Sequence, residues 1–292
     1  MEQPPKPQAP AESTPNFWEM LAPHVLELRK RLLWALVGVA VGVIIAFNLT
    51  TFFLDILTRP IGGLENLLSI EVTENIAVYM RISLLGGFII SLPFVLYQLI
   101  GFITPALEPK EKRWLYIAIP FATTLFLAGV FFTYFVMLPT AIPFLVSFLG
   151  VKTTPRLSSY INFVTSLVFW VGVAFETPLV IFLLAKLHLI TAQALLKQWR
   201  VAVVVIAFLA AIITPTGDPI NMSILMAPLL VLYFFSILLA SLAVDRPPRP
   251  AKPRQPRRKF RLFRPRKAKA TPVEPPITEN PPEPTDQPAD DD

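Results

Sequence analysis

From Leu32 to Phe53 the chain reads LLWALVGVAVGVIIAFNLTTFF, without a charged side chain. A helix of about 20 apolar residues crosses a bilayer core of about 30 Å, so this stretch is long enough to span a membrane. Of the 292 residues, 54% are hydrophobic and only 16% are charged, which leaves too little polar surface for a soluble domain of this size. We therefore expect an all-α membrane protein.

Five further apolar runs follow the first one. They are Ile76 to Ile103, Trp114 to Leu138, Tyr160 to Leu187, Val201 to Ile213, and Met222 to Val244. The run from Val201 gives only about 20 Å of helix at about 1.5 Å per residue. It therefore either meets a thinned bilayer or forms a shallow hairpin with the last run. This pattern predicts six transmembrane helices, of which the last two are short, in a concave helical bundle with a recess on one side.

Polar, proline-rich segments flank the apolar part of the chain. Residues 1–16 lack the features of a cleavable signal peptide and are expected to form a disordered tail. Residues 245–292 form a second such tail, which is first basic and then acidic. The membrane domain is thus predicted at 17–244. Each basic residue near anionic lipid contributes about 1 kcal/mol, so we expect the basic part of the tail to contact anionic lipids and not nucleic acid.

Lysine and arginine gather in alternate connecting segments. Those before the first, third and fifth runs are Arg29, Lys30, Arg31, Lys110, Lys112, Arg113, Lys197 and Arg200. The other two connections, Leu54 to Asn75 and Pro139 to Ser159, are much less basic. By the positive-inside rule, both termini are predicted to lie in the cytoplasm.

The segment before the first span is amphipathic. Its apolar side chains recur at every third or fourth position: Phe17, Leu21, Val25, Leu28 and Leu32. This spacing predicts a helix that lies at the membrane interface and runs into the first span. Glu27 and Arg31 are four residues apart in it, so an ordinary intrahelical ion pair remains open as the explanation of both charges.

The connection from Phe102 to Arg113 reads FITPALEPKEKR, with two prolines, two carboxylates and three cations. One interpretation is an ordinary solvated loop between helices. The other is a binding surface for a cationic ligand, formed if Glu111 and Glu27 converge on the same side of the membrane.

Glu176 interrupts the fourth apolar run within the sequence Phe175-Glu176-Thr177-Pro178. An acidic residue at the centre of a spanning helix costs about 2.5–3.5 kcal/mol, so it usually faces a wet cavity or a partner. Pro178 has no N–H to donate to the Ala174 carbonyl, which predicts a kink and a free acceptor nearby. A functional role for Glu176 is favoured over a purely structural one.

Between the fifth and sixth runs, residues 214–219 read TPTGDP, a dense turn signal. If the flanking helices are short, Thr214 and Asp218 lie at a recessed polar position in the membrane. A plain connecting turn remains the alternative.

Taken together, these motifs resemble the TatC family of the twin-arginine protein translocase. They are HVLELRKRL from His24 to Leu32, Pro60, FITPAL from Phe102 to Leu107 with Glu111, FETP from Phe175 to Pro178, and Thr214-Pro215 with Asp218. The resemblance covers about Phe17 to Val244. The long C-terminal tail is not part of it.

This resemblance implies a signal-peptide receptor and the core of a translocase in the bacterial inner membrane. Such a translocase exports folded proteins with twin-arginine signal peptides and is driven by the proton gradient. Glu27 and Glu111 match the carboxylates that bind the signal peptide, which suits bidentate recognition of two guanidinium groups. Arg29 matches a position that shapes this surface, and Phe102 belongs to the same binding region.

The resemblance also implies single-span partners of the TatA and TatB type, and self-association in a larger complex. Glu176, Thr214, Asp218 and Met222 match the intramembrane positions that face such a partner. Met222 stands where many relatives have glutamine, which puts the contact at this position in doubt. Pro60 and Pro178 match structural positions.

Two other functional classes remain open, a secondary transporter or antiporter that uses Glu176 and a membrane scaffold without transport. The two halves of the chain show no self-similarity, which disfavours an inverted-repeat transporter. No nucleophile with a base and no phosphate-binding loop is present, and the chain has no cysteine and only two histidines, far apart. We therefore expect neither an enzyme nor a metal or other cofactor.

Overall fold

The computed structural model describes residues 17–106, 109–147, 153–214 and 218–243. Within these ranges, the side chains of residues 17–23, 106, 109–111, 114 and 243 are not described. The tails predicted at 1–16 and 245–292 lie outside the described residues, so both stay predictions. The described part is helical, with one isolated pair of bridging residues, Leu68 and Arg156, between two loops.

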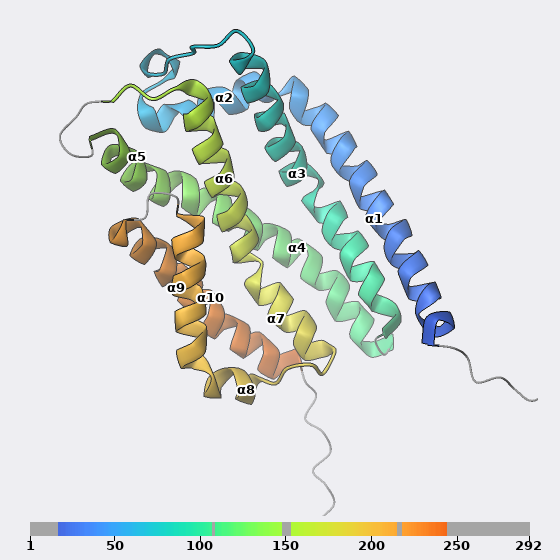
Figure 1. Cartoon of the computed structure of the whole chain (residues 1–292). Helices are drawn as coiled ribbons and strands as arrows, with labels where there is room; N and C mark the ends of the chain where they lie inside the picture. Colours follow the sequence, from blue (N-terminus) through green and yellow to red (C-terminus); the bar gives the residue numbers. More distant parts are fainter. Residues whose placement is uncertain (1–16, 107–108, 148–152, 215–217, 244–292) are drawn as a thin grey trace, which may run out of the picture. The chain divides into compact units, whose positions relative to one another are not determined.

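Helix α1 (Phe17–Asn48) and helix α3 (Glu74–Ile103) lie side by side along their length (Figure 1). The short helix α2 (Thr50–Thr58) and two 3-10 turns, η1 (Arg59–Ile61) and η2 (Leu64–Asn66), connect them. The first span ends at Asn48 and not at Phe53 as the apolar run predicted. The backbone leaves the helical conformation at Leu49 (φ −103°, ψ 4°), so the apolar residues beyond it belong to α2.

Glycines allow the close approach of α1 and α3. A Cβ atom added at Gly87 would lie 2.5 Å from the backbone nitrogen of Val43, and one at Gly42 would overlap the Gly87 carbonyl oxygen. Because lipid tails are as apolar as side chains, spanning helices associate through such close packing more than through the hydrophobic effect. Any larger residue at these two positions would separate the helices.

The third span consists of three segments without a break. The short 3-10 turn η3 (Thr104–Ala106) precedes α4 (Pro109–Phe132), which continues through the π-helical turn η4 (Thr133–Met137) into α5 (Leu138–Ser147). The fourth span is divided in two, α6 (Leu157–Phe175) and α7 (Thr177–Lys186), at Glu176. The predicted kink is therefore confirmed.

The last part contains α8 (Ala192–Lys197), α9 (Trp199–Ile213) and α10 (Pro219–Ala243). Five helices of the described chain are long and apolar enough to cross a membrane, and α9 is a shorter apolar helix of 15 residues. The prediction that the last two spans are both short was wrong for α10, which has 25 residues. Helix α10 begins three residues before the apolar run because Asp218 caps its first turn.

The helices alternate in direction, so the bundle has two ends. We call the end with Glu27, Gly101 and Lys197 the N-terminal end, and the end with Glu71, Glu74 and Arg156 the opposite end. The main core packs α6 and α7 against α10, α9 and the π-helical turn. A hollow of about 540 Å³ lies between α2, α3, α6 and the junction of α4 with the π-helical turn.

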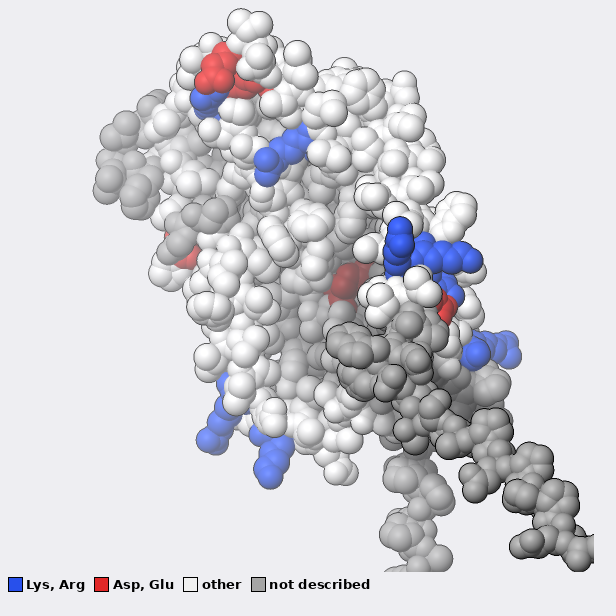
Figure 2. Space-filling model, turned by 45° about the vertical axis from the view of Figure 1, so that its right-hand side comes forward, with Lys and Arg blue, Asp and Glu red and all other residues white. Residues whose placement is uncertain are grey.

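Large apolar side chains cover much of the outer surface. On α1 alone, Leu36, Val37 and Ile44 are each at least half exposed. On the face in Figure 2, most of the surface is uncharged, and the charged side chains form separate patches near the top, at the right, near the centre and at the lower left. This distribution is typical of helices that contact lipid.

Candidate functional site

Glu27 lies at the N-terminal end, on the part of α1 that precedes the apolar run. The Nε and Nη2 atoms of Arg31 both donate to its Oε1, at 3.1 and 3.0 Å. The side chains of Glu27 and Arg31 are about one-third exposed, at 34% and 29%. The predicted intrahelical ion pair is thus present, and it leaves the carboxylate accessible from outside.

Arg31 also packs onto helix α3. A Cβ atom added at Gly101, in the last turn of α3, would overlap the Nη1 atom of Arg31. Because Gly101 has no side chain, there is space for the guanidinium of Arg31 between the two helices. This contact fixes the geometry of the Glu27–Arg31 pair relative to α3.

A groove of about 560 Å³ opens beside this pair. Its lining comes from α1 and α3: Leu26, Glu27, Lys30, Arg31, Trp34, Tyr97 and Gln98. Trp34 and Tyr97 are about half exposed, so aromatic surface borders the carboxylate. Arg29 is exposed on α1 and does not line the groove.

The second predicted carboxylate cannot be placed with the same detail. Glu111 lies in the first turn of α4, but its side chain is outside the described residues. Phe102 is half-buried in the last turn of α3, next to Gly101. The convergence of Glu27 and Glu111 on one ligand stays a prediction.

Glu176 lies at the break between α6 and α7, in the interior of the fourth span. The residue is 9% exposed, and neither carboxylate oxygen has a hydrogen-bond partner among the described residues. A buried polar group without a partner costs about 1–3 kcal/mol, and more if it is charged. The described part of the bundle therefore supplies no hydrogen bond that offsets the burial of this carboxylate.

The free acceptor predicted beside Pro178 is not present. The hydroxyl of Thr177 donates to the Ala174 carbonyl at 2.6 Å, in place of the N–H that Pro178 lacks. This correction has a simple cause, because a threonine directly before a proline can reach back to the preceding turn. The polar character of the break thus comes from Glu176 alone.

The turn between α9 and α10 carries a buried polar cluster. The backbone N–H of Asn221 donates to Asp218 Oδ2 at 2.8 Å, and its side-chain amide donates to both carboxylate oxygens at 3.0 Å. Thr140, on the third span, donates to Asn221 Oδ1 at 2.8 Å. Asp218 and Asn221 are both buried, and so is Thr214, whose hydroxyl donates to Ala210.

These contacts give the turn a structural role, and the contact of Thr214, Asp218 and Met222 with a partner subunit stays a prediction. Asp218 caps α10, and Asn221 connects this cap to the third span. Met222 is half-buried and packs against the main core. The importance of Asn221 was missed, although its place three residues after Asp218, before an apolar run, is a helix-start signal.

Pro60 lies in the 3-10 turn η1 at the opposite end and is half-buried. Gly62 follows with φ at 92°, a left-handed conformation that favours glycine. The chain reverses there toward η2. The position fits a structural role for Pro60, which remains a prediction.

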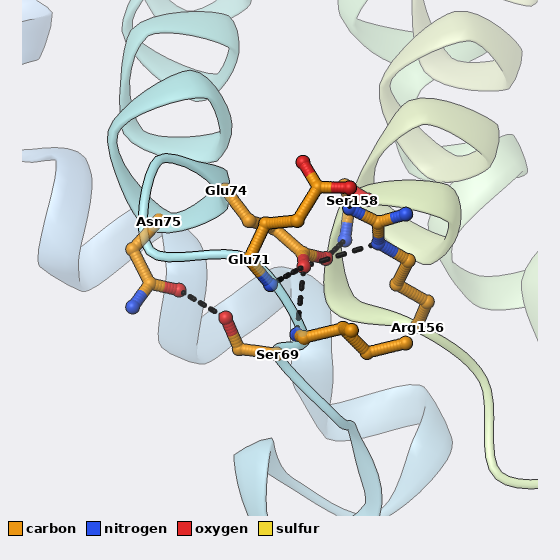
Figure 3. Close-up of polar contacts among 7 residues, drawn as sticks. Ser69, Glu71, Glu74, Asn75, Arg156 and Ser158 are labelled. Atoms are coloured by element: carbon orange, nitrogen blue, oxygen red, sulfur yellow. Dashed lines mark hydrogen bonds and ion pairs between the residues drawn. The ribbon is translucent and has the colours of Figure 1, made fainter.

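A second buried carboxylate, Glu74, was missed by the sequence analysis. Figure 3 shows it at the start of α3, surrounded by donors from two loops. Its Oε2 accepts from the backbone N–H of Ile70 at 2.9 Å and from Arg156 Nε at 3.1 Å. Its Oε1 accepts from the backbone N–H of Ser158 in the first turn of α6 at 2.7 Å. Glu74 thereby caps a helix that is far away in sequence.

Arg156 completes this cluster. It also pairs with Glu71 at 2.8 Å, and these two acids raise the pKa of its guanidinium above the usual value. The same loops are joined by backbone hydrogen bonds of Leu68 with Pro155 and Leu157. We call Glu71, Glu74, Arg156 and Ser158 the loop clamp. The only sequence signal for the loop clamp is the acidic residue Glu74 at the start of a helix. Its partners Arg156 and Ser158 are too distant in sequence to be identified from that signal.

Among the described residues, no group of three or more histidine, cysteine, aspartate or glutamate side chains is placed to hold a metal ion.

Comparison with known proteins gives consistent matches. The family model described as Sec-independent protein translocase protein (TatC) matches residues 23–228. The TatC protein of Carboxydothermus hydrogenoformans is 36% identical over 220 residues, which cover 74% of this chain and 90% of that protein. The TatC protein of Aquifex aeolicus is 39% identical over 235 residues, which cover 77% and 96%.

The fold matches as well. A crystal structure described as the twin arginine translocase receptor TatC in DDM has a TM-score of 0.66 at 35% identity, and the match covers 74% of this chain and 99% of that one. A second crystal structure of this receptor has a TM-score of 0.63 at 36% identity and is covered completely. Because the family model spans more than half of the chain and these relatives align with about three quarters of it, the chain belongs to the TatC family of Sec-independent protein translocase proteins.

Proposed function

We propose that this protein is a signal-peptide receptor and the membrane core of a translocase that exports folded proteins with paired-arginine signal peptides. The groove beside Glu27 is the observation that carries the proposal, together with membership of a family whose solved structures are described as twin arginine translocase receptors. The proton gradient drives the transport, and Glu111 supplies the second carboxylate of the binding surface.

Glu27 has the free capacity that such recognition needs. Arg31 uses only its Oε1 atom, and Oε2 has no hydrogen bond within the described residues. An ionised carboxylate accepts a guanidinium in a bidentate, charge-assisted geometry, which lysine does not reproduce. An incoming arginine therefore finds an acceptor that is held in place and only partly occupied.

The aromatic side chains of the groove suit a second arginine. Trp34 and Tyr97 expose ring surface beside Glu27, and a guanidinium stacks on such faces more readily than an ammonium does. Stacking contributes about 0.5–2 kcal/mol depending on burial. A preference for arginine over lysine is thus expected at both positions of the pair.

The test is binding of a synthetic signal peptide with paired arginines, and of its Lys-Lys twin, to the detergent-purified protein. We expect the arginine peptide to bind more tightly by about tenfold or more, and Glu27→Gln to remove most of this preference. Glu65→Gln is the matched control, because Glu65 is an exposed acid at the opposite end. Equal binding of both peptides, or equal losses in both variants, would contradict the proposal.

The orientation in the membrane is a separate part of the proposal. The N-terminal end carries most of the basic side chains outside the spans, so it faces the cytoplasm of a bacterial inner membrane, with both termini on that side. Because the chain has no cysteine, single cysteines report sidedness cleanly. A membrane-impermeant maleimide added to spheroplasts should label Val72→Cys, which is 94% exposed, and should label His24→Cys only after lysis. The reverse pattern would overturn this orientation.

Glu176 is proposed to engage a single-span partner of the TatA or TatB type within the membrane. Its carboxylate has no partner among the described residues, so a donor from another helix would remove the cost of its burial. Thr214, Asp218 and Met222 support this region through the packing of α9 and α10. Self-association of the receptor and lipid contacts of the basic tail also belong to the proposal.

The same unpartnered carboxylate would suit a proton-coupled antiporter. That alternative predicts ion or solute flux in vesicles that hold this protein alone, and loss of the flux in Glu176→Gln. The translocase proposal predicts no such flux and a loss of export in this variant.

A further inference from the structure

Arg81 is a charged side chain within the second span, and the proposed function does not use it. It lies on α3 seven residues after Glu74, inside a candidate spanning segment. Its Nε donates to Thr165 Oγ1 at 2.9 Å, and its Nη2 donates to Ser166 Oγ at 3.1 Å. Both hydroxyls belong to α6, so the guanidinium is held at the junction of two helices.

No acidic side chain of the described residues contacts Arg81. The ion pairs at this end join Arg59 with Asp55, and Arg156 with Glu71 and Glu74. The Nη1 atom of Arg81 makes no hydrogen bond within the described chain, and the residue is exposed. An exposed, unpaired cation on the side of a membrane bundle requires an anion or water.

Nearby polar groups add to this donor set. The hydroxyl of Ser166 accepts from Arg81, and no acceptor for its own hydrogen is seen among the described residues. Asn162 lies one turn earlier on the same face of α6, is exposed, and has no side-chain hydrogen bond there. Arg81, Ser166 and Asn162 thus form a polar strip on a surface where Trp170 follows next and is 53% exposed.

This strip lies close to the boundary between the hydrocarbon core and the lipid headgroups. Helix α3 has 30 residues, about 45 Å, which exceeds a hydrocarbon core of about 30 Å by about 7 Å at each end if the helix is centred. Arg81 lies about 10 Å from the start of the helix, only about 3 Å inside the core boundary. The hydroxyls of Thr165 and Ser166 hold the guanidinium at this depth, so a lipid phosphate reaches it through local thinning of the bilayer.

We infer that Arg81, Ser166 and Asn162 form a binding site for the phosphate group of a membrane phospholipid, in the leaflet at the opposite end. The guanidinium and the hydroxyl donate to the phosphate oxygens, and the acyl chains lie along the apolar surface beside Trp170. Two fixed hydroxyl contacts hold Arg81 in position before the lipid binds, so little side-chain entropy is lost on binding.

The test is native mass spectrometry of the purified full-length protein, released from detergent in the presence of phosphatidylglycerol. We expect a lipid adduct whose dissociation constant rises about tenfold in Arg81→Gln and about threefold in Ser166→Ala. Arg59→Gln removes the same charge at the same end from a side chain that pairs with Asp55 and makes no hydrogen bond to α6 among the described residues, so it should leave the adduct unchanged. Arg81→Lys keeps the charge and should retain most of the binding, which separates phosphate recognition from loss of folding.

Two further probes identify the ligand group. Dioleoylglycerol, which has no phosphate, should bind the wild type no better than Arg81→Gln binds phosphatidylglycerol. Inorganic phosphate alone should give no adduct at the same free concentration. If phosphate binds as tightly as the lipid, the site recognises anions in general and the inference of a lipid site is wrong. If Arg81→Gln and Arg59→Gln bind phosphatidylglycerol equally, Arg81 does not hold a lipid phosphate and the inference is wrong.

Discussion

Glu74 and Glu176 are both buried, at 3% and 9% exposed, but the two regions around them are opposite in character. In the loop clamp, both oxygens of Glu74 accept hydrogen bonds from backbone or arginine donors. At the break between α6 and α7, neither oxygen of Glu176 has a partner in the described chain. The described residues compensate for burial of the first carboxylate and offer no hydrogen bond to the second.

This difference separates an acid that the fold satisfies from one that has no hydrogen bond among the described residues. A carboxylate that saturates its acceptors within the fold has no capacity left for a ligand. Glu27 at the N-terminal end is intermediate, because one oxygen is paired with Arg31 and the other is available. The number of unused acceptors therefore ranks these three residues for binding, with Glu176 first, Glu27 second and Glu74 last.

The largest effect on stability is expected from Glu74→Leu. This change leaves the N–H groups of Ile70 and Ser158 without their acceptor and removes one of the two acids that Arg156 contacts. We expect the unfolding temperature in detergent, followed by tryptophan fluorescence, to fall by about 5–10 °C. Glu65→Leu, at an exposed position of the same end, should change it little. A similar small change in both variants would show that the loop clamp does not stabilise the bundle.

The same substitution at Glu176 should have the opposite effect on stability. Glu176→Leu removes a buried group without a partner, so the free energy of unfolding should rise by about 1–3 kcal/mol. Export should nevertheless be lost, because the carboxylate that we propose to engage the partner is gone. Equilibrium unfolding in mixed micelles and an export assay in cells measure the two effects. A loss of stability would mean that Glu176 is compensated within the protein, and the contrast with Glu74 would then disappear.

Asp218 is a third buried acid, and its hydrogen bonds to Asn221 allow another test of the comparison between Glu74 and Glu176. Asn221→Ala removes the amide that contacts Asp218 and Thr140, within a cluster that is almost fully buried. We expect the free energy of unfolding to fall by about 1–2 kcal/mol. Asn48→Ala is the control, because that amide is exposed and donates to a single carbonyl. Equal effects in the two variants would show that the Asn221 amide does not stabilise this buried cluster.

The sequence predicted the parts of this fold that depend on local composition. The apolar runs located the spans, and the Pro178 signal located the break in the fourth one. The end of the first span at Asn48 was not predictable from hydrophobicity, because α2 is apolar as well. The start of α10 was not predictable from a count of apolar residues either, because it is set by the cap at Asp218, which is polar.

The candidate site divides in the same way. Glu176 was identified because a charge within an apolar run is unusual by itself, whereas the binding role of Glu27 was implied by the resemblance to the TatC family. Glu74, Arg81 and Asn221 were missed because their partners lie about 80 residues away in sequence, and only the fold brings them together. The sequence identifies a polar residue that is out of place, whereas the structure shows whether it has a partner.

The smallest expected effect concerns the backbone at the break itself. Thr177→Val removes the hydroxyl that donates to the Ala174 carbonyl, whose helical donor is missing at Pro178. We expect a loss of about 1 kcal/mol in the free energy of unfolding, without any change at Glu176. Thr124→Val is the matched control, because its hydroxyl also donates to a carbonyl of the preceding turn, that of Pro120, and this carbonyl keeps its own helical N–H donor. If both variants lose the same free energy, the hydroxyl of Thr177 does not replace the missing donor. The break would then hold a second uncompensated polar group beside Glu176, and the contrast with the loop clamp would extend from one side chain to the whole segment.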